Sequence, residues 1–251
     1  MAIRGVKESL SPKNRCANPG SCPLESLQLF LNNVSQAEWR GFRQSTDVHV
    51  YRPGNILFYQ GNRPLGLYFI CSGRIKLVKE NRAGRSQIVR IVRAPDLLGD
   101  RAFFAGKNYA CTGEVMEESR ICFLETRHFW EVFGRNTEML RLLVQRFAHE
   151  LGCAEEYMSC IAACTVVARM ASHLLTAWKR SGGSRTSKNE FVLAESRTEV
   201  AQLLGTTPEA VSRALAEVCS KGLIAVQGRR VRILSEDRLR LVACLPDSED
   251  Y

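Results

Sequence analysis

Residues 197–217 read RTEVAQLLGTTPEAVSRALAE, and they decide the fold of the C-terminal part of this chain. Glycine adopts a positive φ without strain, as the sharp turn between two helices needs, and Gly205 lies between two helical patterns. The stretch therefore predicts a helix-turn-helix, with an ordinary helical hairpin as the alternative. The apolar residues at helical spacing are Val200, Leu203, Leu204, Val211, Leu215 and Val218.

The second helix of this pair begins with residues suited to its first turn. Thr207 can cap the helix with its hydroxyl, and Pro208 fits the first turn, where no intrahelical N–H bond is lost. Glu209, Ser212 and Arg213 project from one face near the N-terminus of the helix. Because a recognition helix meets the major groove of DNA with this part, we expect these side chains to contact base edges.

The composition is that of an ordinary globular protein with a basic balance. The chain has 251 residues, of which 45% are hydrophobic and 24% charged, enough for one large or two medium domains. Its net charge of +9 favours a polyanionic partner. Basic residues gather in the last third, around the predicted helix-turn-helix: Arg180, Arg185, Lys188, Arg197, Arg213, Lys221, Arg229, Arg230, Arg232, Arg238 and Arg240.

Apolar runs and cysteines bear on the location of the protein. No run approaches the roughly 18 apolar residues of a membrane helix, and MAIRGVKESLSPKNR at the start lacks the apolar core of a secretory signal. We therefore expect a cytoplasmic protein with no membrane partner. Ten cysteines are many for such a protein, and a reducing compartment argues against structural disulfides. We expect buried thiols, metal ligands or redox sensors among them.

Short runs with a period of two fill residues 47–126. Turn residues punctuate them at Pro53-Gly54, Gly61-Asn62, Ser72-Gly73, Gly84 and Gly106. Many short strands at this spacing predict an antiparallel barrel or jelly roll. The runs are DVHVYRPG, ILFYQG, LGLYFICSGRIKLVK, SQIVRIVRAP, ACTGEVME and RICFLE.

A long helical pattern follows, over about residues 127–157. A helix of about 30 residues is about 45 Å long, more than one small roll can cover, so we favour a dimer interface over packing on the helix's own domain. The apolar residues of its seam alternate in steps of four and three: Leu140, Val144, Phe147, Leu151, Ala154 and Met158.

The remaining segments complete an α+β fold. A second helix is expected at about 165–179, followed by the linker KRSGGSRTSK, and GLIAVQGRRVRIL at 222–234 predicts a two-stranded wing that turns at Gln227-Gly228. The expected parts are a cysteine-containing arm (1–24), an antiparallel β-roll or jelly-roll sensor domain (25–126), a dimerisation helix (127–160) and a winged helix-turn-helix domain (161–251).

This order of elements resembles the CRP/FNR family of bacterial transcription regulators, and most closely its oxygen-sensing FNR branch. The motifs that carry the resemblance are YRPGNILFYQG at 51–61, GLYFICSGRIKL at 66–77, DLLGD at 96–100 and EVAQLLGTTPEAVSRALAEV at 199–218. The family implies a homodimer on a palindromic DNA site, with an effector in or beside the roll.

The resemblance also implies how DNA is read. The pattern Glu209-x-x-Ser212-Arg213 looks like that of the FNR branch, whose half-sites resemble TTGAT. Arginine can donate twice to guanine, and glutamate can accept from cytosine. Pro208 stands where the cyclic-AMP branch carries an arginine. The expected DNA-contacting residues are Arg197, Thr207, Pro208, Glu209, Ser212 and Arg213.

A cyclic nucleotide is not the expected effector. Family members that bind cyclic AMP use a glutamate for the ribose and an Arg-Ser pair for the cyclic phosphate, and the corresponding positions here look like Asp100 and Tyr109-Ala110. A buried phosphate without a cation would be uncompensated. Arg101 or Lys107 could substitute for the missing arginine.

The cysteines indicate an iron–sulfur cluster instead. The FNR branch holds a [4Fe–4S] cluster with three cysteines in the arm and one in the roll. Cys16 and Cys22 resemble the last two arm cysteines, and Cys122 resembles the one in the roll, so one arm cysteine is missing. If residues 116–119 form a hairpin turn, Cys111 lies diagonal to Cys122, which makes Cys111 the first candidate for the fourth ligand and Cys71 the second.

Other effectors stay open. A disulfide or sulfenate switch of Cys16 and Cys22 competes with a cluster. Haem would need an axial ligand, and none of His49, His128, His149 and His173 stands in a distinctive pattern. Cys153, Cys160 and Cys164 lie roughly on one helix face, where they could bind a soft metal or simply pack as small residues.

The remaining functional expectations concern enzymes and RNA polymerase. No Ser–His–Asp order, H-E-x-x-H, P-loop or G-x-G-x-x-G is visible, so we expect no enzyme. The family's activators touch RNA polymerase through a loop that corresponds to residues 82–86. FNR-like proteins often carry an acidic residue there, whereas this chain has Arg85, which leaves both activation and repression open.

Ala154 predicts a dimer that does not depend on a cofactor. In the FNR branch an acidic residue at this seam position weakens the dimer unless the cluster is bound, and a paired carboxylate there would repel its mate. A small apolar residue carries no such cost. Light scattering on the cofactor-free protein should give the mass of a dimer, and a monomer would refute the prediction.

Overall fold

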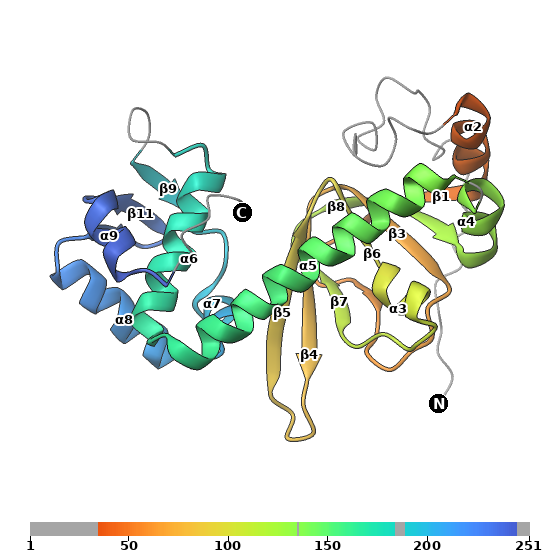
Figure 1. Cartoon of the computed structure of the whole chain (residues 1–251). Coiled ribbons are helices and arrows are strands. Elements are labelled where there is room, and N and C mark those ends of the chain that lie inside the picture. Colours follow the sequence, from red (N-terminus) through yellow and green to blue (C-terminus); the bar gives the residue numbers. More distant parts are fainter. Residues whose placement is uncertain (1–34, 135, 184–188, 245–251) are drawn as a thin grey trace. The chain divides into compact units, whose positions relative to one another are not determined.

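The computed structural model describes residues 35–134, 136–183 and 189–244 (Figure 1). Contacts divide the chain into two compact units, one ending at Arg146 and the other beginning at Phe147. The boundary falls inside one long helix, and each unit is described by itself.

The first unit is built on two antiparallel sheets of four strands each. One sheet has the order β1-β8-β3-β6 and the other the order β2-β7-β4-β5, which confirms the predicted roll. The strands are β1 (Thr46–Tyr51), β2 (Ile56–Phe58), β3 (Gly66–Ser72), β4 (Arg74–Glu80), β5 (Ser86–Arg93), β6 (Asp96–Leu98), β7 (Thr112–Val115) and β8 (Ser119–Glu125). The helices are α2 (Gln36–Ser45), α3 (Asp100–Ala105) and α4 (Thr126–Phe133).

Gly73 forms the corner where the chain passes from one sheet to the other, between β3 and β4. Its φ of +93° is one that other residues rarely adopt. A Cβ at this position would lie 2.0 Å from Oγ of Ser119, at the start of β8. The corner therefore requires glycine both for its backbone conformation and for its space.

Apolar side chains of the two sheets fill the roll between them. The aromatic rings of Phe58 and Tyr109 stack with centroids 4.0 Å apart, and the Tyr68 hydroxyl donates to the Leu57 carbonyl. Burial raises the pKa of Tyr109 to about 12, so this hydroxyl stays neutral. The buried members of this cluster are Phe58, Ile70, Ile75, Val92, Leu98, Ala102, Tyr109, Val115 and Ile121.

The long helical pattern divides into two helices. The prediction of one continuous helix over about residues 127–157 is wrong, because α4 ends at Phe133 and α5 runs from Thr137 to Ala163. Asn136 explains the division: its side-chain Oδ1 accepts a hydrogen bond from the Met139 backbone N–H at 2.9 Å. Such a cap begins a new helix, and Gly134 is the C-cap of the helix before it.

Arg146 anchors α5 to the roll. Its guanidinium contacts the carboxylate of Asp96, lies 3.4 Å from Oδ2 of Asp100 and donates to the Leu97 carbonyl at 3.0 Å. The Arg146 side chain is 15% exposed and that of Asp100 is 8% exposed. Arg90 also pairs with Asp96 at 3.0 Å. The positive charges of the two arginines thus neutralise the negative charges of the two aspartates beneath α5.

The second unit packs helices against a three-stranded sheet in the order β10-β11-β9. Its elements are the end of α5, α6 (Val166–Arg180), β9 (Glu190–Val192), α7 (Arg197–Leu204), α8 (Pro208–Ser220), β10 (Ile224–Gln227), β11 (Arg230–Ile233) and α9 (Glu236–Val242). The predicted second helix, helix-turn-helix and wing are confirmed, whereas β9 was not predicted. In the part of the chain that the structure describes, no helix has the length and apolarity to cross a membrane.

Removing the anchor of α5 should destabilise the protein. Arg146→Ala leaves Asp96 and Asp100 largely buried with less compensating charge, and breaking such pairs typically costs about 3 kcal/mol. We expect the free energy of unfolding in urea to fall by about that amount. Arg141→Ala, which removes an exposed arginine paired with Glu138 on the same helix, is the control and should leave it unchanged. Equal effects of the two variants would contradict the anchoring role.

Candidate nucleic-acid interface and cysteine sites

The turn between α7 and α8 has the geometry expected from its sequence. Gly205 adopts a φ of 61° at the end of α7, and the Thr207 hydroxyl accepts from the Ala210 backbone N–H at 3.3 Å. Ser196 and Glu199 form a capping box at the start of α7, a feature that the sequence analysis missed although its Ser-x-x-Glu pattern was readable. Both helices of the pair are thus fixed at their N-termini by side-chain caps.

Helix α8 separates an apolar face from a polar one. Val211, Ala214, Leu215 and Val218 are buried in the core of the second unit. Glu209, Ser212 and Arg213 are exposed on the other face, as predicted. The Ser212 hydroxyl donates to the Pro208 carbonyl at 3.0 Å. A hydrogen bond from its own backbone N–H, followed by one from Thr207, lowers the pKa of Glu209 and keeps it ionised.

The three other predicted DNA-contacting residues lie at the starts of the two helices. Arg197 is the first residue of α7 and is half-buried, while Thr207 and Pro208 stand at the start of α8. This helix-turn-helix arrangement brings a donor-rich arginine and an acceptor-rich glutamate to one exposed surface. Such a surface can pair with guanine and cytosine edges in a major groove.

The wing pairs its strands in register from Ile224–Ile233 to Gln227–Arg230, and Gly228 turns it with a φ of 62°. Arg229 donates to the Leu193 carbonyl at 3.1 Å and contacts the Ala194 carbonyl. Arg232 pairs with Glu190 of β9 at 3.0 Å. These contacts show that the arginines of the wing also hold its third strand in place.

The roll cysteines are arranged differently from the prediction. The hairpin turn considered for residues 116–119 does not form, because β7 pairs with β2 and β4, whereas β8 pairs with β1 and β3. Cys111 therefore precedes a strand of one sheet, and Cys122 lies in the other. Sγ of Cys122 is 3.3 Å from Sγ of Cys71, and both side chains are buried.

Cys71 and Cys111 differ in chemical character. The hydrogen bond with Cys122 is the main factor that lowers the pKa of Cys71; burial opposes it, and the charge of Arg120 adds to it. Burial is the main factor that raises the pKa of Cys111, although Arg101 and Lys79 counteract it. Cys71 sits at a shift of register in the β3–β8 pairing, between Ile70 and Ser72.

The other predicted ligands fall into two groups. Cys16 and Cys22 lie outside the described residues. Of the histidines, His128 lies 3.9 Å from Glu131, His173 lies 3.9 Å from Glu195, and His149 lies 3.6 Å from Sγ of Cys153. His49 is half-buried in β1, near the ring of Tyr51.

In the second unit, Cys164 is joined to Cys244 by a disulfide that the sequence analysis did not expect. The two cysteines are separated by 80 residues, so their pairing required the fold to be known.

Two side chains at the positions expected to contact a cyclic nucleotide contact other protein groups instead. Asp100 faces Arg146, and Tyr109 stacks on Phe58. Among the described residues, the buried polar or charged ones are Thr46, Asp100, Ser119 and Glu195.

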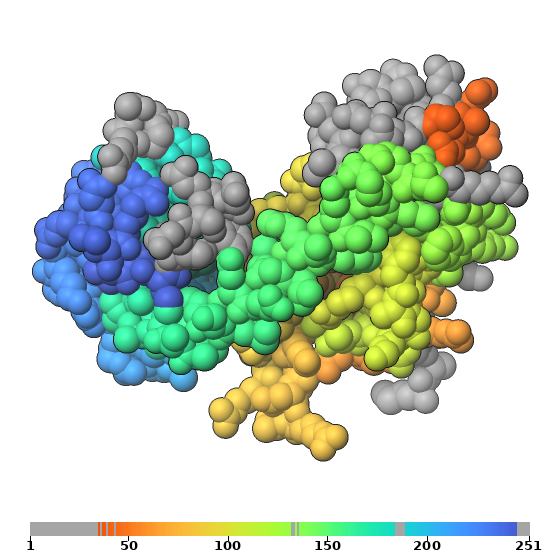
Figure 2. Space-filling model, viewed as in Figure 1, coloured from red at the N-terminus to blue at the C-terminus, as the bar shows by residue number. Residues whose placement is uncertain are grey.

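Helix α5 carries a row of exposed apolar side chains. Val144, Leu151 and Met158 follow one another at seven-residue steps and are 66%, 60% and 61% exposed. Ala154 is also exposed, whereas Leu140 and Phe147 are half-buried. In Figure 2 the surface of α5, drawn in green, lies open on the viewed face. Exposed apolar residues at this spacing are typical of a helix–helix interface.

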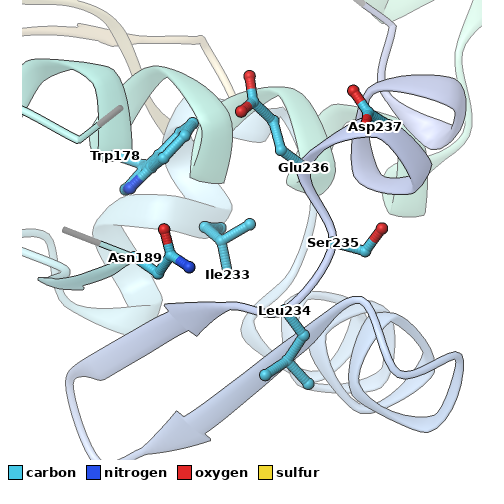
Figure 3. A pocket seen from close by; sticks show the side chains of 7 residues that line it. All are labelled: Trp178, Asn189, Ile233, Leu234, Ser235, Glu236 and Asp237. Atoms are coloured by element: carbon cyan, nitrogen blue, oxygen red, sulfur yellow. The ribbon is translucent and has the colours of Figure 1, made fainter. Parts of the chain in front are cut away.

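A pocket of ≈ 300 Å³ lies in the second unit (Figure 3). It is lined by Trp178, Asn189, Ile233, Leu234, Ser235, Glu236 and Asp237. Glu236 and Asp237 stand in the first turn of α9, where carboxylates stabilise a helix N-terminus, and Glu236 pairs with Arg240. These carboxylates thus have a structural role in the helix.

Two family models match the chain. The model of the cyclic nucleotide-binding domain matches residues 48–136, and that of the Crp-like helix-turn-helix domain matches residues 168–242. The chain is 28% identical over 194 residues to the nitrogen fixation regulation protein FixK of Rhizobium meliloti, covering 77% of this chain and 85% of that protein. It is 25% identical over 190 residues to the fumarate and nitrate reduction regulatory protein of Escherichia coli, covering 76% of each.

The solved structures agree on the fold. The structure of FixK2 from Bradyrhizobium japonicum has a TM-score of 0.68 and 22% identity, and the match covers 79% of this chain and 97% of that one. A sensor-type roll and a helix-turn-helix on one chain define a DNA-binding transcription regulator. The chain belongs to the CRP/FNR family, whose members similar to it are transcription regulators rather than enzymes.

Arg213 is the side chain on which sequence-specific binding should depend most. We expect Arg213→Ala to weaken binding to a TTGAT-type palindrome by about 1–3 kcal/mol and to relax the choice of base at one position per half-site. Arg238→Ala is the control, since it removes the same charge from α9, where Arg238 donates to the Lys221 carbonyl. Fluorescence anisotropy with matched and single-substituted DNA checks both. If the two variants lose affinity equally on all sequences, Arg213 reads no base.

Proposed function

We propose that this regulator is a homodimer that binds a TTGAT-like palindrome and responds to redox state or to a gas through Cys16, Cys22, Cys71 and Cys122. The observation that carries the sensor is the contact of 3.3 Å between the buried Cys71 and Cys122 sulfurs. Cys71 replaces Cys111 in this proposal, because Cys111 precedes a strand of the other sheet.

The DNA site follows from the exposed face of α8. Glu209 is ionised and accepts hydrogen bonds, while Arg213 donates, so one helix offers partners for both members of a G·C pair. A symmetric dimer repeats this face and calls for two inverted half-sites about one turn of DNA apart. The exposed row Val144, Leu151 and Met158 supports such a dimer.

An iron–sulfur cluster is the first candidate for what the four cysteines hold. Thiolates are the usual ligands of such clusters, and four is their usual number. The charge of Arg120 beside Cys71 favours the thiolate that a metal requires. Binding of two different irons would require the Cys71 and Cys122 sulfurs to move apart, and the irregular pairing at Cys71 supports such an adjustment. When bound, the cluster supplies a group that oxygen can oxidise.

A thiol switch is the second candidate, and the short Cys71–Cys122 contact favours it. Two thiols and one hydrogen peroxide give one disulfide and two water molecules, so the electrons of the sulfurs reduce the peroxide. A disulfide needs an S–S distance near 2.05 Å, which is a small movement from 3.3 Å. Cys16 and Cys22 remain the alternative pair for such a switch.

Cyclic AMP is not part of the proposal. The Asp100 carboxylate is engaged by Arg146, and Tyr109 stands where a phosphate-binding arginine is needed. A buried phosphate without a cation costs several kcal/mol or more.

RNA polymerase is the proposed protein partner through the turn between β4 and β5. Asn81 stiffens this turn, because its side-chain Oδ1 accepts from the backbone N–H groups of Ala83 and Arg85 at 2.9 and 3.1 Å. The side chain of Arg85 is exposed there. A basic residue at this surface favours an acidic patch on the polymerase.

Iron, acid-labile sulfide and the visible spectrum of protein purified without oxygen test the sensor. We expect about four irons and four sulfides per subunit, with absorbance that bleaches in air. Cys71→Ser should abolish the cluster, whereas Cys111→Ser, the matched control, should retain it.

The same experiment separates the candidates. Colourless, metal-free protein that forms a Cys71–Cys122 disulfide under peroxide would replace the cluster by the thiol switch. Loss of iron in Cys111→Ser but not in Cys71→Ser would overturn the assignment of Cys71.

A further inference from the structure

A third cysteine stands beside the disulfide of the second unit. The Sγ atoms of Cys160, Cys164 and Cys244 all lie within 4.8 Å of one another, and the three residues are half-buried. Sγ of Cys160 is also 4.0 Å from the Cys244 carbonyl oxygen. The disulfide accounts for two of these three sulfurs. The position of the third, that of Cys160, needs another explanation.

The three cysteines come from two distant parts of the chain that are held together. Cys160 and Cys164 are one helical turn apart at the end of α5, and Cys164 leads into α6. Cys244 follows α9, and its backbone N–H donates to the Ser172 hydroxyl of α6 at 2.9 Å. The sulfurs are therefore placed by helix geometry and by a backbone hydrogen bond.

One cation lies near these sulfurs. Arg169 donates to the Ile161 carbonyl at 3.3 Å, and its positive charge opposes the effect of burial, which is the main factor that raises the pKa of Cys160. Three thiolates close together repel each other unless a cation neutralises them. A bound metal ion would do so most effectively.

We propose that, in the reduced protein, Cys160, Cys164 and Cys244 bind one thiophilic metal ion of the Zn²⁺ class. Soft thiolate ligands select such ions, and a tetrahedral ion with bonds of about 2.3 Å holds its sulfurs about 3.8 Å apart. Three protein thiolates leave a fourth position for water. The site is separate from the proposed redox sensor, which uses other cysteines.

The disulfide is the oxidised form of this site. A dithiol reductant gives two electrons and two protons to the Cys164–Cys244 bond, which breaks into two thiols while the reductant becomes a disulfide. The metal ion then displaces the protons of the three thiols. Because Cys164 lies between α5 and α6, the ion would tie this junction to the end of α9.

Binding of Co²⁺ and Zn²⁺ to the full chain tests the proposal. The chain carries Cys16→Ser and Cys22→Ser, which removes the arm ligands of the proposed cluster, and is reduced, freed of metal and kept without oxygen. We expect one equivalent of Co²⁺ with a thiolate-to-metal charge-transfer band that Zn²⁺ abolishes. In this background Cys160→Ser should weaken Zn²⁺ binding by more than about tenfold.

Two controls keep the test specific. Cys219→Ser, in the same unit but outside the group of three, and Cys71→Ser, in the roll, should both leave the affinity unchanged. If Cys160→Ser does not fold, as judged by circular dichroism, Cys244→Ser provides the same test beyond the last helix.

Three results would overturn the proposal. They are reduced protein without a thiolate–Co²⁺ band, equal losses of affinity in Cys160→Ser and Cys219→Ser, and a Cys164–Cys244 disulfide that survives reduction, as shown by alkylation and mass spectrometry. If the proposed redox sensor is disproved, the results expected from this test do not change, because the tested chain lacks the arm cysteines.

Discussion

The ion pairs of Arg146 with Asp96 and Asp100 connect the roll to the helix that leaves it. Charges taken out of water are costly unless they are paired, so each of these three residues needs the others. The pairing fixes α5 against β6 and α3. One arginine thus holds the helix in place against the roll.

Local patterns predicted most of the fold. The alternation in runs such as SQIVRIVRAP indicates strands, and Gly205 with Thr207 indicates the helix-turn-helix, because these signals lie within a few residues of each other. The division at Asn136 was missed, since a single capping side chain interrupts an otherwise continuous apolar pattern. Strand β9 was missed because three residues carry too little periodicity.

The sites depended more on tertiary structure. The face of Glu209, Ser212 and Arg213 follows from helix geometry alone, and the structure has it exposed. The contact of Cys71 with Cys122 required the knowledge that β3 pairs with β8 in one sheet. Cys244 meets Cys164 across 80 residues, a separation at which no sequence spacing carries information.

The hydroxyl of Ser212 has a consequence for the bases that α8 can select. Its single proton is directed at the Pro208 carbonyl, so only the lone pairs of the oxygen face outward. In the proposed complex with DNA, Ser212 would therefore act as an acceptor beside the ionised Glu209, while Arg213 would donate. A surface with this polarity favours the amino groups of cytosine or adenine next to a guanine, and it disfavours thymine, whose groove edge offers only an acceptor and a methyl group.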